Sequence, residues 1–160
     1  MGYSTDFIGQ FKVSPPLLNA DKEFLTKFSN TRRMARNVGP EYGIEGEFYV
    51  GGEDRDTPLS ENADGAGSTI LNYNVPPKTQ PGLWCQWIPT EDGCAIEWSG
   101  GEKFYCYVEW IEYLIAKILR PRGYVLNGTV EWQGEDRYDM GAIVIKDNTV
   151  EVKQGRIVYD

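Results

Sequence analysis

The stretch that decides the fold is residues 102–119, EKFYCYVEWIEYLIAKIL. Apolar side chains recur in it every three or four positions, which is the spacing of one face of an α-helix. Pro121 follows and ends the run, because the residue before a proline is biased away from helical backbone. We predict an amphipathic helix from about Glu102 to Leu119. Its apolar stripe comprises Phe104, Tyr107, Val108, Ile111, Leu114, Ile115, Ile118 and Leu119.

A second helix is predicted from Asn19, acting as its N-cap, to about Arg36. Asp21 would lie in its first turn, and a cluster of arginines that includes Arg32 and Arg33 would lie at its end. Both placements complement the helix dipole. The chain therefore supplies two helices that each need an apolar surface to cover.

The remaining apolar runs alternate with polar residues, which is typical of β-strands. Four of them form two hairpins, one over Asp92-Gly93 and one over Asp147-Asn148. Two further short strands are expected before the first hairpin, at 47–50 and 69–73, and one last strand at 156–159. The main strands are predicted at residues 6–13, 83–89, 94–98, 124–133, 141–146 and 149–153.

These elements predict one α+β domain over residues 1–160, with a mostly antiparallel sheet and two helices packed on one face. The closest named architecture is a ferredoxin-like core, the split βαβ arrangement. Residues 39–82 are glycine- and proline-rich, so we read them as a long insertion or flap within that core.

The chain of 160 residues has a formal net charge of −8. That charge repels nucleic-acid phosphates and anionic membrane surfaces, so we expect no direct nucleic-acid binding and no membrane partner. Solubility explains an acidic surface, and imitation of a nucleic acid is a sharper alternative. Aromatic residues make up 13% of the chain. This excess indicates either a core built from rings or a surface that binds something apolar.

Three cysteines without metal-ligand spacing and no histidine argue against a disulfide framework and against a transition-metal site. No signal-peptide pattern or membrane-spanning run is expected either. We therefore predict a cytoplasmic protein that has no cofactor and no metal. Acidic turns such as 53–56 and 134–139 lack the calcium-loop pattern.

Two segments near the ends of the chain resemble a known family. They are Met1-Gly2-Tyr3 with Gly9 and Pro15-Pro16-Leu17, and the run 128–136, GTVEWQGED. This pattern is similar to that of a family of small bacterial and phage-associated proteins of unknown function. The resemblance implies a shared domain. It implies no activity and transfers no catalytic residue.

Carboxylates form the first candidate site. Glu97 and Glu131, with Glu135 beyond them, fall in or beside predicted strands, on the face opposite the neighbouring tryptophans. If those strands are adjacent, the two carboxylates lie close enough for acid–base chemistry. The alternative is that they are solvated residues on the open face of a sheet.

Tryptophans form the second candidate site. Trp84 and Trp87 are an odd number of positions apart, so a regular strand directs them to opposite faces and one of them lies off the core. Trp98 and Trp132 belong to the same aromatic set, with Tyr105 and Tyr113 on the helix predicted at 102–119. Trp110 falls outside the main stripe of its helix, so we predict that it is partly exposed and anchors a partner. Core packing is the alternative for all of them.

Arginines form the third candidate site. Arg32, Arg33 and Arg36 lie within five positions of an otherwise acidic chain. Forked guanidinium contacts can hold a phosphate or a carboxylate. The alternative is a structural role, through the helix dipole and ion pairs with the acidic 41–64 loop.

We rank a non-enzymatic binding protein first, with another protein as its partner. Histidine is absent, and no nucleophile with its base is recognisable, so no catalytic residue is assigned. An inhibitor or an immunity-like protein of a mobile element fits by analogy. The alternatives are a carboxylate-dependent hydrolase acting on a glycan or nucleotide, and an acidic nucleic-acid mimic. The partner's identity and the oligomeric state stay open.

Overall fold

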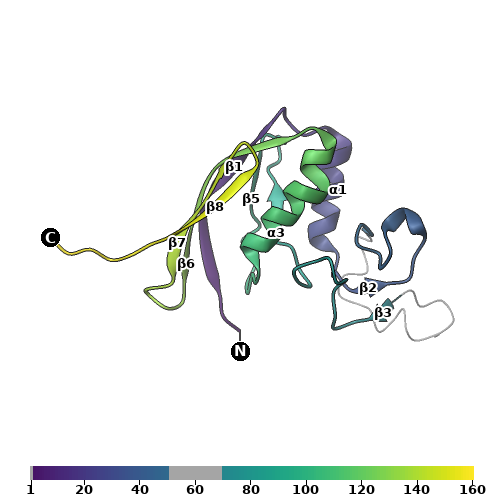
Figure 1. Ribbon diagram of the computed structural model, residues 1–160, viewed down its shortest axis with the longest axis horizontal. Coiled ribbons are helices and arrows are strands. Elements are labelled where there is room, and N and C mark those ends of the chain that lie inside the picture. Colours follow the sequence, from purple (N-terminus) through teal and green to yellow (C-terminus); the bar gives the residue numbers. More distant parts are fainter. Residues whose placement is uncertain (1, 51–69) are drawn as a thin grey trace.

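The computed structural model describes residues 2–50 and 70–160. Six antiparallel strands form one sheet in the order β4-β5-β1-β6-β7-β8. Both helices lie on the same side of this sheet (Figure 1). The α+β prediction, a mostly antiparallel sheet with two helices, is confirmed. The sheet strands are β1 (Thr5–Ser14), β4 (Trp87–Pro89), β5 (Ala95–Trp98), β6 (Val125–Gly134), β7 (Met140–Lys146) and β8 (Thr149–Gln154), and the helices are α1 (Asn19–Asn30) and α3 (Tyr107–Leu114).

Strands β1 and β6 form the centre of the sheet and pair along ten residues. Alternation places Phe7, Phe11 and Val13 on the helix side, where each is buried, and it leaves Ile8 on the far side with 75% of its surface exposed. Gly9 has a φ of +116°, and a Cβ there would meet the carbonyl oxygen of Thr129 at 2.5 Å. Glycine is therefore required at this position, because any side chain would collide with the backbone of β6.

The core lies between the sheet and the helices. Helix α1 contributes Leu25 and Phe28, as its spacing predicts. Helix α3 continues directly into a π-helical turn (Ile115–Leu119) and then a 3-10 turn (Arg120–Arg122), so its apolar stripe extends to Leu119. Phe7 packs edge-on against several rings from β4 and α3. The aromatic excess thus builds much of the core.

Both helices are shorter than the sequence predicts. Helix α1 ends at Asn30 rather than Arg36, because Thr31 is extended and the N–H of Arg33 donates to the carbonyl of Leu83. Leu18 precedes the first helical residue, so Asn19 is not the N-cap. Helix α3 begins at Tyr107 rather than Glu102. The backbone turns left-handed before it, with a φ of +58° at Cys106, and that turn interrupts a helical stripe that is continuous in the sequence.

The strand predictions hold in the six-stranded sheet, and the strand expected at 69–73 is present outside it as β3 (Ile70–Asn72). Both hairpins are confirmed, and Asp147 and Asn148 adopt the left-handed backbone of a two-residue turn. Strand β4 begins at Trp87 rather than Leu83. Residues 47–50 form a turn instead of a strand, since the N–H of Phe48 returns to the carbonyl of Tyr42.

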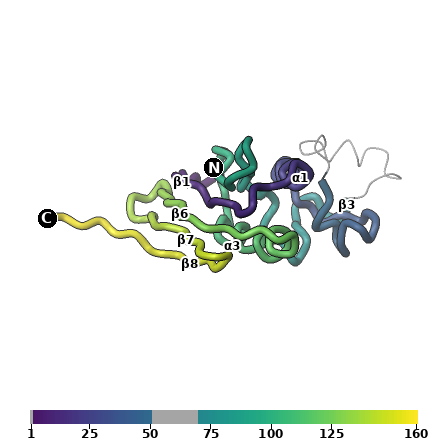
Figure 2. Tube along the Cα trace, turned by 90° about the horizontal axis from the view of Figure 1, so that it is seen from above, coloured from purple at the N-terminus to yellow at the C-terminus, as the bar shows by residue number. Residues whose placement is uncertain are grey.

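The two ends of the molecule carry the least regular chain. At one end, β2 (Ala35–Arg36) pairs with β3 (Ile70–Asn72), near the short 3-10 turn Pro40–Tyr42. At the other end, residues 155–160 form no strand, contrary to the prediction for 156–159, and leave the sheet as an extended tail (Figure 2). Most of the predicted loop inside the 39–82 insertion, residues 51–69, lies outside the described residues.

Candidate functional site

Two hollows meet at Trp84, beside the β4 edge of the sheet. The larger has a volume of about 640 Å³ and the smaller about 290 Å³, and both are lined by Trp84 and Gln86. Together they form what we call the Trp84 groove. Its larger hollow is lined by Asn74, Pro76, Pro81, Gly82, Leu83, Trp84, Gln86, Glu102, Lys103, Tyr105 and Cys106, and its smaller hollow by Thr26, Ser29, Asn30, Trp84, Gln86, Ile88, Ser99 and Gly101.

The backbone that carries Trp84 is fixed on both sides. Ser29 donates its hydroxyl to the carbonyl of Cys85 at 2.7 Å, which ties the segment to α1. The side-chain amide of Gln86 donates to the carbonyl of Glu102 at 2.7 Å and accepts the indole N–H of Trp98 at 3.0 Å. The groove is therefore held open by hydrogen bonds that involve its own walls, which lowers the cost of ordering it on binding.

The walls of the larger hollow are mainly apolar and aromatic. Trp84 is half-buried between the two hollows, while Tyr105 keeps 52% of its surface exposed. Pro76 and Pro81 add rigid apolar surface. Sites that bind ligands or partner side chains combine such surfaces with few polar groups. The exposed carboxylate of Glu102 supplies a charge at this site.

Trp110 lies beneath the groove and is fully buried, with 0% of its surface exposed. The prediction that it is partly exposed is wrong. It packs edge-on against Phe28 of α1 and Tyr113 of its own helix, because α1 covers the flank of α3 outside the apolar stripe. Within the described chain its indole N–H has no hydrogen-bond acceptor, and Gly82 lies directly over it.

The structure assigns the other tryptophans to the core or its margin. Trp87 is buried and donates its indole N–H to the carbonyl of Tyr107 at 2.8 Å. Trp132 is buried as well and donates to a carboxylate oxygen of Asp139 at 3.0 Å. Trp98 is half-buried against Phe7. Of the predicted tryptophans, Trp84 alone lines the groove.

Glu97 and Glu131 share the sheet face away from the helices, but β1 lies between their strands. Neighbouring strands are spaced about 4.8 Å apart, so the strands carrying them are about 10 Å apart. Glu97 accepts a hydrogen bond from Gln10 at 3.1 Å. Glu135 lies elsewhere and accepts the backbone N–H of Ser4. The adjacency that a carboxylate pair needs is absent.

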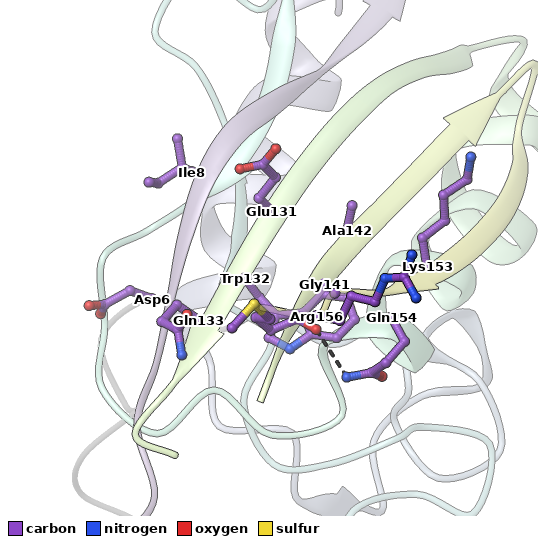
Figure 3. A pocket seen from close by; sticks show the side chains of 12 residues that line it. Asp6, Ile8, Glu131, Trp132, Gln133, Gly141, Ala142, Lys153, Gln154 and Arg156 are labelled. Atoms are coloured by element: carbon purple, nitrogen blue, oxygen red, sulfur yellow. Dashed lines mark hydrogen bonds between the residues drawn. The ribbon is translucent and has the colours of Figure 1, made fainter. Parts of the chain in front are cut away.

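A third hollow, of about 470 Å³, lies on this open face at the start of the C-terminal tail (Figure 3). Glu131 and Ile8 line it on one side, and Lys153 and Arg156 on the other (Figure 3). Its charges are of mixed sign, and they lie beside the apolar surfaces of Ile8, Met140 and Ala142. The one aromatic ring that lines this hollow, Trp132, is buried, so it offers less surface to a partner than the half-buried Trp84 does.

The three arginines stabilise the β2–β3 end of the molecule through contacts within the chain. Arg33 and Arg36 are each 1% exposed, and their guanidinium groups stack over the rings of Phe28 and Tyr49. Arg33 also donates to the carbonyl of Glu47 at 2.8 Å. Arg32 stacks on Tyr73 and donates to its carbonyl. These contacts fasten residues 42–49 and 73 to the end of α1.

The thiols are poor nucleophiles in this environment. Burial raises the pKa of the Cys85 thiol to about 12. Burial, with the nearby charge of Glu109, also raises the pKa of Cys106. Thiolate is the reactive form, so both residues are held in the unreactive state at neutral pH. Among residues 2–50 and 70–160, no group of three or more acidic or cysteine side chains is placed to hold a metal ion.

No helix in the described part of the chain is long and apolar enough to cross a membrane. Sequence analysis missed most of the groove, because its walls come from irregular segments near 74–86 and 102–106 that have no periodic pattern. The odd spacing of Trp84 and Trp87 pointed towards it, as did the inclusion of Tyr105 among the candidate aromatic residues. Comparison with known proteins finds no matching family model, no matching curated protein and no matching solved structure.

Proposed function

We propose that this chain is a non-enzymatic binding protein that holds an extended segment of a partner protein in the Trp84 groove. The observation that carries the proposal is the position of Trp84, half-buried between two hollows on a hydrogen-bonded backbone. An apolar or aromatic side chain of the partner fills the larger hollow. Anchors of this kind dominate the binding energy of protein interfaces.

The charge of the chain favours a basic partner segment. The net charge of −8 attracts cationic chains over long range and speeds their association. At the groove, Glu102 and Lys103 are both exposed, but the aliphatic chain of Lys103 lies against Gly2. We therefore propose that a lysine or arginine of the partner, adjacent to the apolar anchor, pairs with Glu102.

An inhibitory or immunity-like role for a mobile element suits a small acidic binder, by analogy and through the resemblance noted above. A hydrolase gains no support, because β1 separates Glu97 from Glu131. The three cysteines are free thiols, which supports a reducing, cytoplasmic setting.

We also propose that the core is a ferredoxin-like split βαβ arrangement. The order β1-α1-β4-β5-α3-β6 along the chain supports this, together with the antiparallel strand order β4-β5-β1-β6. The β7–β8 hairpin extends that sheet at one edge. The segment between α1 and β4 then forms the insertion, and it supplies part of the groove.

A selection from a library of random extended peptides tests the proposed function. We expect enriched peptides to share an apolar anchor followed or preceded by a basic residue. Trp84→Ala should weaken their binding by about 30-fold or more, the effect of removing an interface hot spot. Tyr138→Ala is the matched control, since Tyr138 is 64% exposed and lies outside the groove. Peptides that bind the Trp84→Ala protein as tightly as the wild type would refute the proposal.

A further inference from the structure

Strand β8 forms an edge of the sheet, and no described strand pairs with its outer side. Its six residues, Thr149–Gln154, are exposed except for the half-buried Val150. Val152 keeps 48% of its surface exposed. An unpaired strand of this length presents a row of free backbone N–H and C=O groups, which is a template for another strand.

The hairpin fixes which of these groups point outwards. The two-residue turn at Asp147-Asn148 pairs Lys146 with Thr149, and at the other end the N–H of Gly155 donates to the carbonyl of Met140. In an antiparallel ladder every second residue bonds to the neighbour, so residues 149, 151, 153 and 155 bond to β7. The backbone groups of residues 150, 152 and 154 therefore point away from the sheet.

The side chains of β8 are complementary to a second copy of the same strand. Glu151 and Lys153 project from the sheet face away from the helices, where Figure 3 shows Lys153 beside the open hollow. Antiparallel pairing about a twofold axis at Val152 places Glu151 opposite Lys153 of the second copy, and Lys153 opposite Glu151. Opposite charges directly across an antiparallel pair stabilise it, so the charges of β8 suit pairing with a second copy of the same strand.

We propose that β8 is a homodimer interface, in which β8 pairs antiparallel with β8 of a second copy about a twofold axis at Val152. The pairing matches the outward groups: Val152 bonds to Val152, and Val150 bonds to Gln154, giving six backbone hydrogen bonds by the antiparallel pattern. It covers the exposed valines on one face and forms two opposite-charge pairs on the other. Such an interface is isologous, as in most homodimers.

The inference is independent of the proposed function, because β8 and β4 are opposite edges of the sheet. The dimer is one continuous twelve-stranded sheet that carries a Trp84 groove at each outer end. Because each dimer carries two grooves, it can bind at two points a partner that contains two copies of the bound segment. A dimer-breaking change in β8 leaves the single-site affinity of each groove unaltered.

Sedimentation equilibrium of the full chain tests the proposal. We expect a mass twice the 18.1 kDa of one chain as concentration rises through the micromolar range. In the Lys153→Glu variant, a carboxylate at position 153 lies opposite Glu151 of the other copy in both symmetric pairs. This repulsion should raise the dissociation constant of the dimer about tenfold or more. The double variant Glu151→Lys with Lys153→Glu restores opposite charges and should restore the dimer. Circular dichroism confirms that each variant is folded.

Amide hydrogen exchange supplies a second readout. The N–H groups of Val150, Val152 and Gln154 should exchange more slowly as the protein concentration increases, and those of Lys12 and Thr129 on the open face should not respond. A wild-type chain that stays monomeric overturns the proposal. So does a dimer that is indifferent to Lys153→Glu, or a double variant as weak as the single one.

Discussion

Two buried tryptophans, Trp110 and Trp132, differ in whether the indole N–H donates a hydrogen bond, and stability measurements can resolve this difference. Trp110 is 0% exposed and its indole N–H has no acceptor within the described chain, whereas Trp132 is 6% exposed and donates to Asp139 at 3.0 Å. Replacing either residue by phenylalanine removes the same atoms. Trp110→Phe and Trp132→Phe therefore form a matched pair in which the lost volume is constant.

The magnitude follows from the hydrogen-bond inventory. Trp132→Phe loses a hydrogen bond to a charged group, which costs about 1.5–3 kcal/mol in addition to the lost packing. Trp110→Phe loses the packing too, but it also removes a buried unsatisfied donor whose desolvation costs about 1–3 kcal/mol. We therefore expect Trp132→Phe to be the more destabilising change by about 2 kcal/mol or more.

Urea denaturation followed by far-ultraviolet circular dichroism measures both free energies of unfolding. Equal slopes of the free energy against urea would show that the two variants unfold in the same way. A difference of 2 kcal/mol corresponds to about 4–8 °C in Tm for a chain of this size. The reasoning is refuted if the two variants lose the same stability, or if Trp110→Phe loses more.

Three further predictions follow from contacts described above. Gly9→Ala should lower the free energy of unfolding by about 2 kcal/mol or more, because the added Cβ would lie 2.5 Å from the carbonyl oxygen of Thr129. Gly100→Ala should lower it clearly less in the same urea denaturation assay, because Gly100 has a φ of +86° but no atom within 4 Å of an added Cβ. The free energy of unfolding should fall as pH rises above about 9, because the Cys85 thiol ionises there in the unfolded chain while burial holds its pKa in the folded protein at about 12. In unfolding curves recorded at successive pH values, Cys85→Ala should make this fall less steep. Trp84→Ala should cost less stability than Trp110→Ala, for which about 3–5 kcal/mol is expected, since only the latter empties a fully buried site.

Much of the sheet follows from the sequence because its signals are local. Alternation fixes β1 and β6, and turn residues such as Asp147 and Asn148 fix the β7–β8 hairpin. The helix ends do not follow in the same way. Phe104 belongs to the apolar stripe of residues 102–119 and is buried as predicted, yet left-handed residues before Tyr107 exclude it from α3.

The candidate site follows from the sequence only in part. Trp84 lines the groove and Trp87 lies in the core, as the odd spacing predicts, although Trp84 precedes β4 and is not itself part of a strand. Periodicity failed for Trp110, because it describes one helix and not the second helix that packs across it. The separation of Glu97 from Glu131 depends on strand order, which no local pattern in either strand encodes.

Chemical-shift mapping with a peptide from the selection tests the central claim most directly. The claim predicts that peptide-induced shifts concentrate in residues 81–86 and 102–106, with the indole N–H resonance of Trp84 among the largest. Shifts concentrated instead on the open sheet face, at Ile8, Thr129 and Glu131, would contradict it and place the binding surface on the other side of the molecule.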